Sequence, residues 1–342
     1  MEEDSSTSFF LPRQAGSLIS MKLLTYFFAT SLLILSEASL GQQQKQAPSA
    51  GVILYNQLKF DAAFPALKKE ALSGNVDSQY YLAEALRKRN RYMTPEAWHW
   101  YETAAANGSI YAMIQLGRKD TDLCKIMENC PASARTPAEW LSYARELTLQ
   151  NANKGDAESL FLMYEITLDY EWLEKSAKAG YALAQYWMAV GERQGRGFFF
   201  IPGKRDESVR NWFRLSSEGG YPLAMNNYLA ILENEGDRQA VHYWLKVAAE
   251  TGEPEAMSNY GAYISHTPDR VGYPLDLVKG YAMFYLLKEL KDAGGIKDYV
   301  DQKIEMIAEK MTPEQIEESK IVAKEWKATH PPLSFFPDKL GN

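Results

Sequence analysis

Histidine is the side chain that most often serves as a general base or a metal ligand near neutral pH, and this chain of 342 residues contains four. They are widely separated, and no metal-ligand spacing connects them. The sequence also lacks H-E-x-x-H, G-x-S-x-G and a phosphate loop ending in G-K-[ST]. We therefore expect histidines on helix surfaces, no bound metal, no cofactor and no enzymatic activity. The four histidines are His99, His242, His266 and His330.

A phrase led by tryptophan, W-[YLF]-x-x-[AS]-[AS]-x-x-G-x-x-x-A, predicts the elements that hold these residues, and it occurs four times without a gap. In a helix of 3.6 residues per turn, the tryptophan and the small pair four and five residues later lie near one face. The small pair lets a neighbouring helix approach closely, and the glycine fits a helix C′ position, which needs φ > 0. The phrase thus predicts a helix, a turn and a second helix, with the tryptophan in the core. The four tryptophans are Trp100, Trp172, Trp212 and Trp244.

Two weaker copies of the phrase end in Gly74 and Gly155 and lack the tryptophan. Self-similarity of this kind is typical of a repeat array, whose units bury their apolar faces on one another. A helix pair needs only about thirty-odd residues. The intervals that end at Gly155 and Gly220 are 47 and 40 residues long, so both must contain additional loops.

The phrase resembles the Sel-one-like repeat, a relative of the tetratricopeptide repeat. The segment 191–197 is similar to that family's G-x-G turn between the two helices of a unit, and Gly195-Arg196-Gly197 lacks the strand and third glycine of a dinucleotide site. Residues 280–285 resemble its terminal repeats, and 312–326 is similar to its C-terminal capping helix. The resemblance covers roughly residues 54–330. It implies an all-α, right-handed α-solenoid that binds partners without a shared active site.

The beginning of the chain predicts export. Residues 23–35 form an apolar run after Met21-Lys22, too short to span a bilayer but suited to a signal peptide. Residues 21–41 are the expected signal peptide, with cleavage after Gly41 or, alternatively, after Ala38, and no cysteine at the boundary to carry a lipid. Residues 1–20 fit no signal peptide and are interpreted as an upstream extension of the true start at Met21. We expect a disordered leader over 42–53, the repeats over 54–330, a tail over 331–342, and a periplasmic protein without a stable membrane anchor after cleavage.

Export changes the interpretation of the two cysteines, Cys124 and Cys130. In one continuous helix they would lie about 9 Å apart along the axis, too far for a disulfide, whereas a turn would bring them together. An oxidising compartment favours the bond, and neither C-x-x-C nor a nearby histidine supports a redox or metal site. We expect a disulfide that closes the loop in the 47-residue interval.

The additional loops are the expected partner-binding regions, because insertions project from one face of a repeat stack. In the first loop, four consecutive apolar residues cannot all face inward from a turn, so the loop either folds back onto a groove or offers aromatic anchors. A second, more polar insertion could belong to the same rim, and Phe335-Phe336 either adds a third aromatic candidate or caps the last helix. The candidates in the two insertions are Phe198, Phe199, Phe200, Ile201, Lys204, Arg205, Arg270 and Tyr273.

Charge and layout indicate the class of partner. A net charge of −7 argues against nucleic acid, which demands a basic stripe, and favours a protein. In size and layout, the chain is similar to periplasmic immunity proteins encoded beside type VI secretion phospholipase effectors. That likeness implies an inhibitor that occludes a cognate lipase toxin. The alternatives are a periplasmic scaffold that assembles envelope complexes and, because some relatives with a cysteine pair in every repeat are linked to β-lactams, a β-lactam-binding enzyme.

Overall fold

The structure is a computed structural model that describes residues 48–118, 128, 133–290 and 295–340. The described residues all belong to one compact unit, which begins at Pro48. The expected upstream extension, the signal peptide and the leader up to residue 47 lie outside them. Among the described helices, none combines the length and hydrophobicity needed to cross a membrane.

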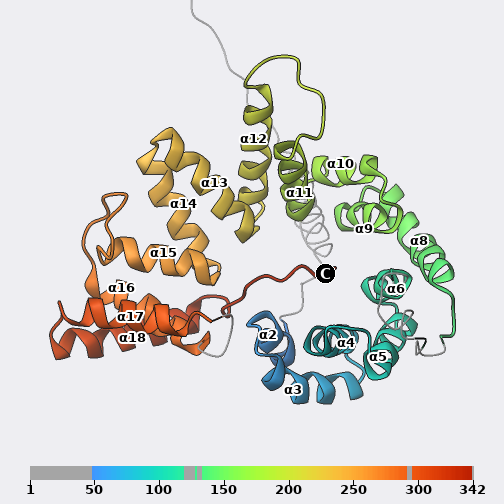
Figure 1. The fold of residues 1–342 in the computed structure, drawn as a ribbon, viewed down its shortest axis with the longest axis horizontal. Coiled ribbons are helices and arrows are strands. Elements are labelled where there is room, and N and C mark those ends of the chain that lie inside the picture. The colour runs from blue at the N-terminus through green and yellow to red at the C-terminus, as the bar shows by residue number, and fades with distance from the viewer. Residues whose placement is uncertain (1–47, 119–127, 129–132, 291–294, 341–342) are drawn as a thin grey trace, which may run out of the picture. The chain divides into compact units, whose positions relative to one another are not determined.

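The described residues contain sixteen α-helices and one 3-10 helix, and no strand occurs among them. From α2 to α16 each helix packs mainly on its neighbours in the chain, whereas α17 and α18 both pack on α16, so the core follows the chain (Figure 1). This arrangement confirms the predicted all-α solenoid. In chain order the elements are α2 (Ala50–Asn56), α3 (Phe60–Leu72), α4 (Val76–Asn90), α5 (Pro95–Ala106), α6 (Ile110–Gly117), α8 (Pro137–Asn153), α9 (Ala157–Thr167), α10 (Tyr170–Lys178), α11 (Ala182–Arg193), α12 (Lys204–Glu218), α13 (Pro222–Glu235), α14 (Arg238–Glu250), α15 (Pro254–Ile264), α16 (Leu277–Leu287), η2 (Lys288–Leu290), α17 (Lys297–Ala308) and α18 (Pro313–Thr329).

The repeat glycines close the first helix of each pair, as the phrase predicts. Gly180, with φ 92°, separates α10 from α11, and Tyr181 N donates to Ser176 O at 3.1 Å to close the turn. A side chain is strained at such a φ, which explains the glycine. The same left-handed conformation occurs at all six predicted turns, at Gly74, Gly108, Gly155, Gly180, Gly220 and Gly252.

The small pairs form the most deeply buried part of each complete phrase, and all eight of their side chains are at most 2% exposed. Three of these residues are serines, and two of them donate to a main-chain acceptor in the preceding helix pair, whereas Ser217 Oγ donates to Phe213 O in its own helix. Ser176 Oγ donates to Ala157 O and Ser216 Oγ donates to Ala182 O, each at 2.6 Å. A hydroxyl is therefore tolerated in the core, because its hydrogen bond is satisfied there.

The tryptophans lie less deep than predicted. Trp100 is buried, but Trp172, Trp212 and Trp244 are only partly buried. The residue after each tryptophan is at most 3% exposed and fills the core instead. That residue precedes the small pair by three and four positions, so it lies directly on the buried stripe. These four deeper residues are Tyr101, Leu173, Phe213 and Leu245.

The array begins earlier than predicted. Helix α2 starts at Ala50, so residues 50–53 of the expected disordered leader are helical. Ser49 caps this helix, and its hydroxyl donates to the Glu70 carboxylate at 2.6 Å. Val52 and Tyr55 are buried against the first repeat. The polar stretch before residue 48 conceals this short apolar helix in the sequence.

Two further predictions concern loops. Cys124 and Cys130 lie outside the described residues, between α6 and α8. The segment 191–197 includes the last residues of α11 and begins the loop to α12, so it lies between two helices that pack on each other.

The tail continues past α18 and returns to the beginning of the array (Figure 1). Ser334 N donates to Gly252 O at 3.1 Å, and Phe335 N donates to Asn56 O at 2.9 Å. Leu340 then enters the apolar cluster of the first repeats. The sequence left two alternatives for Phe335-Phe336, an aromatic binding candidate or a cap on the last helix, and in the structure this segment bridges the last repeats and the first.

Candidate partner-binding site

The loop between α11 and α12 exposes a compact group of large apolar side chains. Phe198 is 81% exposed, Phe200 is 87% exposed and Ile201 is 63% exposed. The rings of Phe198 and Phe200 meet edge to face, with centroids 4.7 Å apart. These three residues, called the apolar tip below, present a preformed surface to solvent.

Phe199, between these residues, is partly buried and packs on its own loop. The Arg205 guanidinium lies over its ring, 4.8 Å from the centroid. The sequence leaves two alternatives for this loop, self-packing or exposed anchors. Both occur in the structure, because Phe199 packs on its own loop while the residues of the apolar tip are exposed.

Arg205 fixes the conformation of this loop. Its Nη1 donates to the carbonyls of Glu192 and Arg196, at 2.6 and 2.7 Å, and its Nη2 donates to Gly197 O at 3.2 Å. One guanidinium therefore ties the end of α11 to the turn that follows it. A planar side chain with several fixed donors suits this task better than a lysine. Arg205, a predicted partner-binding residue, is mainly a positioning residue for the tip.

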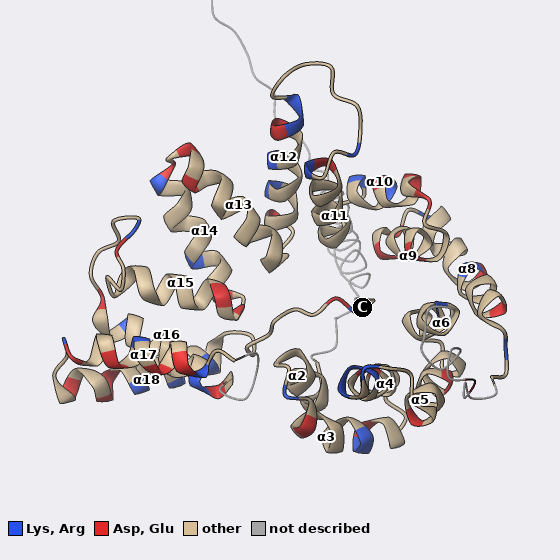
Figure 2. Ribbon diagram, in the orientation of Figure 1, with Lys and Arg blue, Asp and Glu red and all other residues tan. Residues whose placement is uncertain are grey.

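Lys204 begins α12 and forms an ion pair with Glu207, whose Oε2 lies 2.6 Å from the lysine Nζ. Both side chains are more than half exposed, so the pair adds little stability. Two basic residues, Lys204 and Arg205, are followed by two acidic ones, Asp206 and Glu207, at this end of α12 (Figure 2). A charged rim of both signs thus accompanies the apolar tip.

A cleft of about 450 Å³ lies beside the loop, and sequence analysis missed it. Its polar feature is Tyr170, whose buried hydroxyl has no hydrogen-bond partner among the described residues. Arg196 covers the Tyr170 ring at 4.2 Å from its centroid. Burial raises the pKa of Tyr170, although the guanidinium opposes this, so the hydroxyl remains a donor at neutral pH. The cleft is lined by Tyr164, Tyr170, Leu173, Trp187, Val190, Gly191, Gln194 and Arg196.

One sequence signal for the cleft was available in Gly191. A Cβ at this position would lie 3.3 Å from Tyr170 Oη, so the glycine permits the close approach of α11 to Tyr170. Nearby, the repeat residue Trp212 donates from Nε1 to the buried Glu192 carboxylate at 3.1 Å. This bond gives the partly buried indole a polar role at the same junction.

The second insertion, between α15 and α16, is packed on the array. Tyr273 stacks on His242 with centroids 4.0 Å apart, and its hydroxyl donates to His242 O at 2.6 Å. His266 Nε2 donates to Tyr273 O at 2.8 Å. Arg270 is exposed. Helices α12 to α15 separate this loop from the apolar tip in the chain, and no described contact joins the two, so the expected common rim does not form (Figure 1).

The histidines are distributed as surface or packing residues. His99 is exposed on α5, His242 and His266 belong to the Tyr273 cluster, and His330 stacks on Trp326 at 3.7 Å. No group of three or more His, Cys, Asp or Glu side chains capable of holding a metal occurs in the described ranges. The α11–α12 region combines an apolar tip, a charged rim and a cleft with one unpaired hydroxyl, an arrangement suited to binding another molecule.

The solved structures similar to this chain include two bacterial proteins. One is a protective antigen of uropathogenic Escherichia coli described as displaying an SLR fold, with 20% identity and a TM-score of 0.44 over 79% of this chain and 57% of that one. This chain therefore covers little more than half of that protein. The other is a Sel1 repeat protein from Oxalobacter formigenes, with 18% identity and a TM-score of 0.40 over 93% of this chain and 97% of that one. No family model and no curated protein matches the sequence.

Proposed function

We propose that this chain is an exported protein-binding repeat protein that acts as an immunity protein. It binds a cognate type VI secretion phospholipase effector in the periplasm and covers the entrance to its active site. The observation that carries the proposal is the apolar tip, held in place by Arg205 and exposed to solvent. Exposed aromatic side chains beside a charged rim are typical of the centre of a protein interface.

The tip favours a partner with an apolar pocket, and the cleft favours a partner with a protruding side chain. Phe198 and Phe200 would enter a pocket on the lipase, and the cleft would accept a side chain that pairs with the Tyr170 hydroxyl. A stable inhibitory complex of this kind buries roughly 1,600 Å² in total, which exceeds the tip alone. The surfaces of α10 and α11 beside the loop would supply the remainder. Inhibition is steric and uses no chemistry of this chain.

The test is co-expression of the mature protein with a lipase recovered from periplasmic extract by pull-down. Wild-type protein should protect the cells, and Phe198→Ser combined with Phe200→Ser should abolish both capture and protection. The matched control is Leu72→Ser combined with Tyr243→Ser, which removes comparably exposed side chains on α3 and α14. If the lipase remains fully toxic with wild-type protein, the immunity function is wrong.

Two alternative results identify the other functions. Recovery of several envelope proteins without a lipase, each bound weakly, would favour the scaffold. Hydrolysis of a β-lactam by the purified protein would favour the enzyme. Unchanged capture by the Phe198 and Phe200 variant would reject the tip as the binding surface while leaving protein binding intact.

A further inference from the structure

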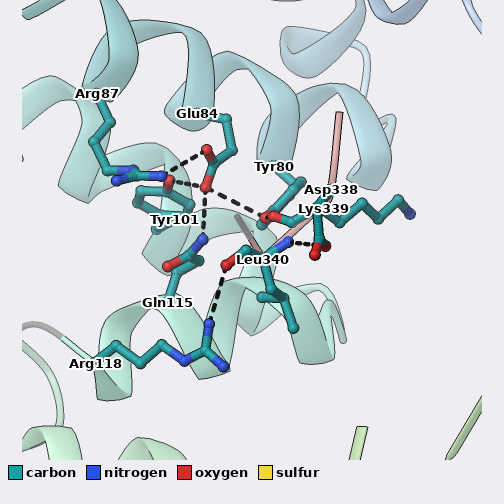
Figure 3. A network of polar contacts seen from close by, with 9 residues as sticks. All are labelled: Tyr80, Glu84, Arg87, Tyr101, Gln115, Arg118, Asp338, Lys339 and Leu340. Atoms are coloured by element: carbon teal, nitrogen blue, oxygen red, sulfur yellow. Dashed lines mark hydrogen bonds and ion pairs between the residues drawn. The ribbon is translucent and has the colours of Figure 1, made fainter. Parts of the chain in front are cut away.

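Residues 338–340 of the C-terminal tail lie beside the first repeats, where Tyr80 of α4 and Arg118, at the end of α6, bind its main chain (Figure 3). The Tyr80 hydroxyl donates to Lys339 O, and Arg118 Nη1 donates to Leu340 O at 3.1 Å. Both donors bind backbone carbonyls of a turn over residues 339 and 340, which Leu340 N closes by donating to Asp338 Oδ1 at 3.0 Å. The polar contacts of the site therefore bind the main chain of the occupant and do not select a particular polar side chain.

Leu340 supplies the side-chain contact. It is 6% exposed and belongs to the apolar cluster of the first repeats. Lys339, by contrast, is held loosely, with its Nζ 3.6 Å from the largely exposed Asp77 and 4.5 Å from the centroid of the Tyr111 ring. A buried leucine flanked by bound carbonyls is the pattern of a peptide in a groove, with one anchoring side chain.

A buried carboxylate organises the groove. Glu84 is 1% exposed, and its Oε1 accepts from Tyr101 Oη at 2.5 Å and Gln115 Nε2 at 2.9 Å. Its Oε2 accepts from Arg87 Nη2 at 3.0 Å. Burial raises the pKa of Tyr101 well above its usual value, so its hydroxyl remains a donor. These donors come from α4, α5 and α6, and none belongs to the tail.

Tyr80 can satisfy its hydroxyl with or without the tail. Its single hydrogen has two acceptors in reach, Lys339 O and Glu84 Oε1, the second at 3.3 Å. When the tail leaves, the hydrogen can turn to Glu84, so no buried donor is orphaned. Arg118 likewise keeps its ion pair with Glu165, which is independent of the tail. The polar part of the groove is thus complete in both states.

We propose that this groove on α4 and α6 is a binding site for a peptide segment that makes a turn at a leucine, and that the chain's own tail is its exchangeable occupant. A partner segment of the same chemistry would replace Leu340 and release the tail. The site uses helices other than those beside the apolar tip, so it stands or falls independently of the proposed immunity function.

The experiment uses a fluorescein-labelled synthetic peptide with the sequence of residues 331–342 and the full-length protein. Wild-type protein should bind it weakly, because the tail occupies the groove and the apparent affinity falls with the fraction of open sites. A full-length Leu340→Asp variant should bind the peptide about tenfold more tightly or better, because a buried carboxylate expels the tethered tail. A second peptide carrying Leu340→Asp is the control and should not bind.

Two substitutions in the groove add specificity to the test. Tyr80→Phe in the Leu340→Asp background should weaken peptide binding roughly fivefold through one lost hydrogen bond. Arg193→Met, which removes an exposed arginine that bonds Asn227 far along the chain, should leave peptide binding unchanged.

Equal binding by wild-type and Leu340→Asp proteins would overturn the proposal, as would binding by neither. Loss of the helical circular dichroism spectrum in Leu340→Asp and in the milder Leu340→Ala would also overturn it, because the tail would then be an obligatory part of the fold.

Discussion

Two insertions with aromatic residues interrupt the repeats, and they differ in how far these residues pack on the array. The α15–α16 loop turns Tyr273 inward, where a stacked histidine and a main-chain acceptor hold it. The α11–α12 loop turns only Phe199 inward and leaves Phe198 and Phe200 in solvent. Both loops interrupt similar helix pairs, so position in the array does not decide the outcome.

The difference lies in what the neighbouring helix offers. Helix α14 presents both a ring and a carbonyl, which suit a tyrosine that can stack and donate. Helix α12 presents one guanidinium, that of Arg205, which covers a single ring and donates hydrogen bonds to main-chain carbonyls. An insertion therefore leaves apolar side chains exposed when these outnumber the partners that the array supplies.

The largest effect should follow removal of the inward aromatic in the α15–α16 loop. Tyr273→Ala should lower the free energy of unfolding by about 2–3 kcal/mol, because a partly buried ring and its hydroxyl bond are lost. The measurement is the urea midpoint followed by circular dichroism. A change of less than about 0.5 kcal/mol would mean that this loop is not packed on the array.

Loss of the guanidinium in the α11–α12 loop should have an intermediate effect. Arg205→Met should cost about 1–2 kcal/mol, because three carbonyls lose a charged donor while partial exposure limits the loss. Backbone hydrogen exchange over residues 194–203 should increase more than elsewhere. Unchanged exchange in this loop would show that Arg205 does not position the tip.

A smaller effect should depend on pH. Burial raises the pKa of Tyr273 above its usual value, and Tyr260 adds to this shift. A pKa raised by folding gives stability that is complete below about pH 10, the usual tyrosine value, and is lost as the pH rises further. Tyr273→Phe should therefore cost about 1 kcal/mol at pH 8 and less above pH 10. Urea midpoints at the two pH values provide the measurement, and an identical difference at both would contradict the shift.

The smallest effect on stability should come from the apolar tip. Phe198→Ser combined with Phe200→Ser should change the free energy of unfolding by less than about 0.5 kcal/mol, because both rings are already in water. Thermal melting of the variant beside Tyr273→Ala sharpens the contrast between the loops. A strong destabilisation would show that the tip packs on part of the protein and is not free to bind.

Sequence predicts the repeats well because their signals are local. A glycine with positive φ and a small pair on one helical stripe act within a dozen residues, so Gly180 and Ser176 occupy the predicted places. Trp172 lies less deep than predicted, because the following leucine is better aligned with the small pair. The short helix α2 was hidden because a polar leader precedes it.

The candidate site was predicted only in part, since its geometry depends on contacts between distant segments. Phe198 and Phe200 remain exposed because the Arg205 guanidinium packs on Phe199 instead, and no sequence pattern indicates which of the three rings it covers. The cleft at Tyr170 requires α10, α11 and the following loop to come together. The end of the tail contacts a residue 259 positions earlier, and no periodicity in the sequence encodes such a pairing.

That pairing changes how the array should come apart. Repeat arrays interact between neighbours, so their two ends can fray separately. Here Leu340 of the tail belongs to the apolar cluster of the first repeats, so unfolding of one end destabilises the other. Heat or denaturant should thus melt both termini of the array together while the tail is docked, and one after the other once it is displaced.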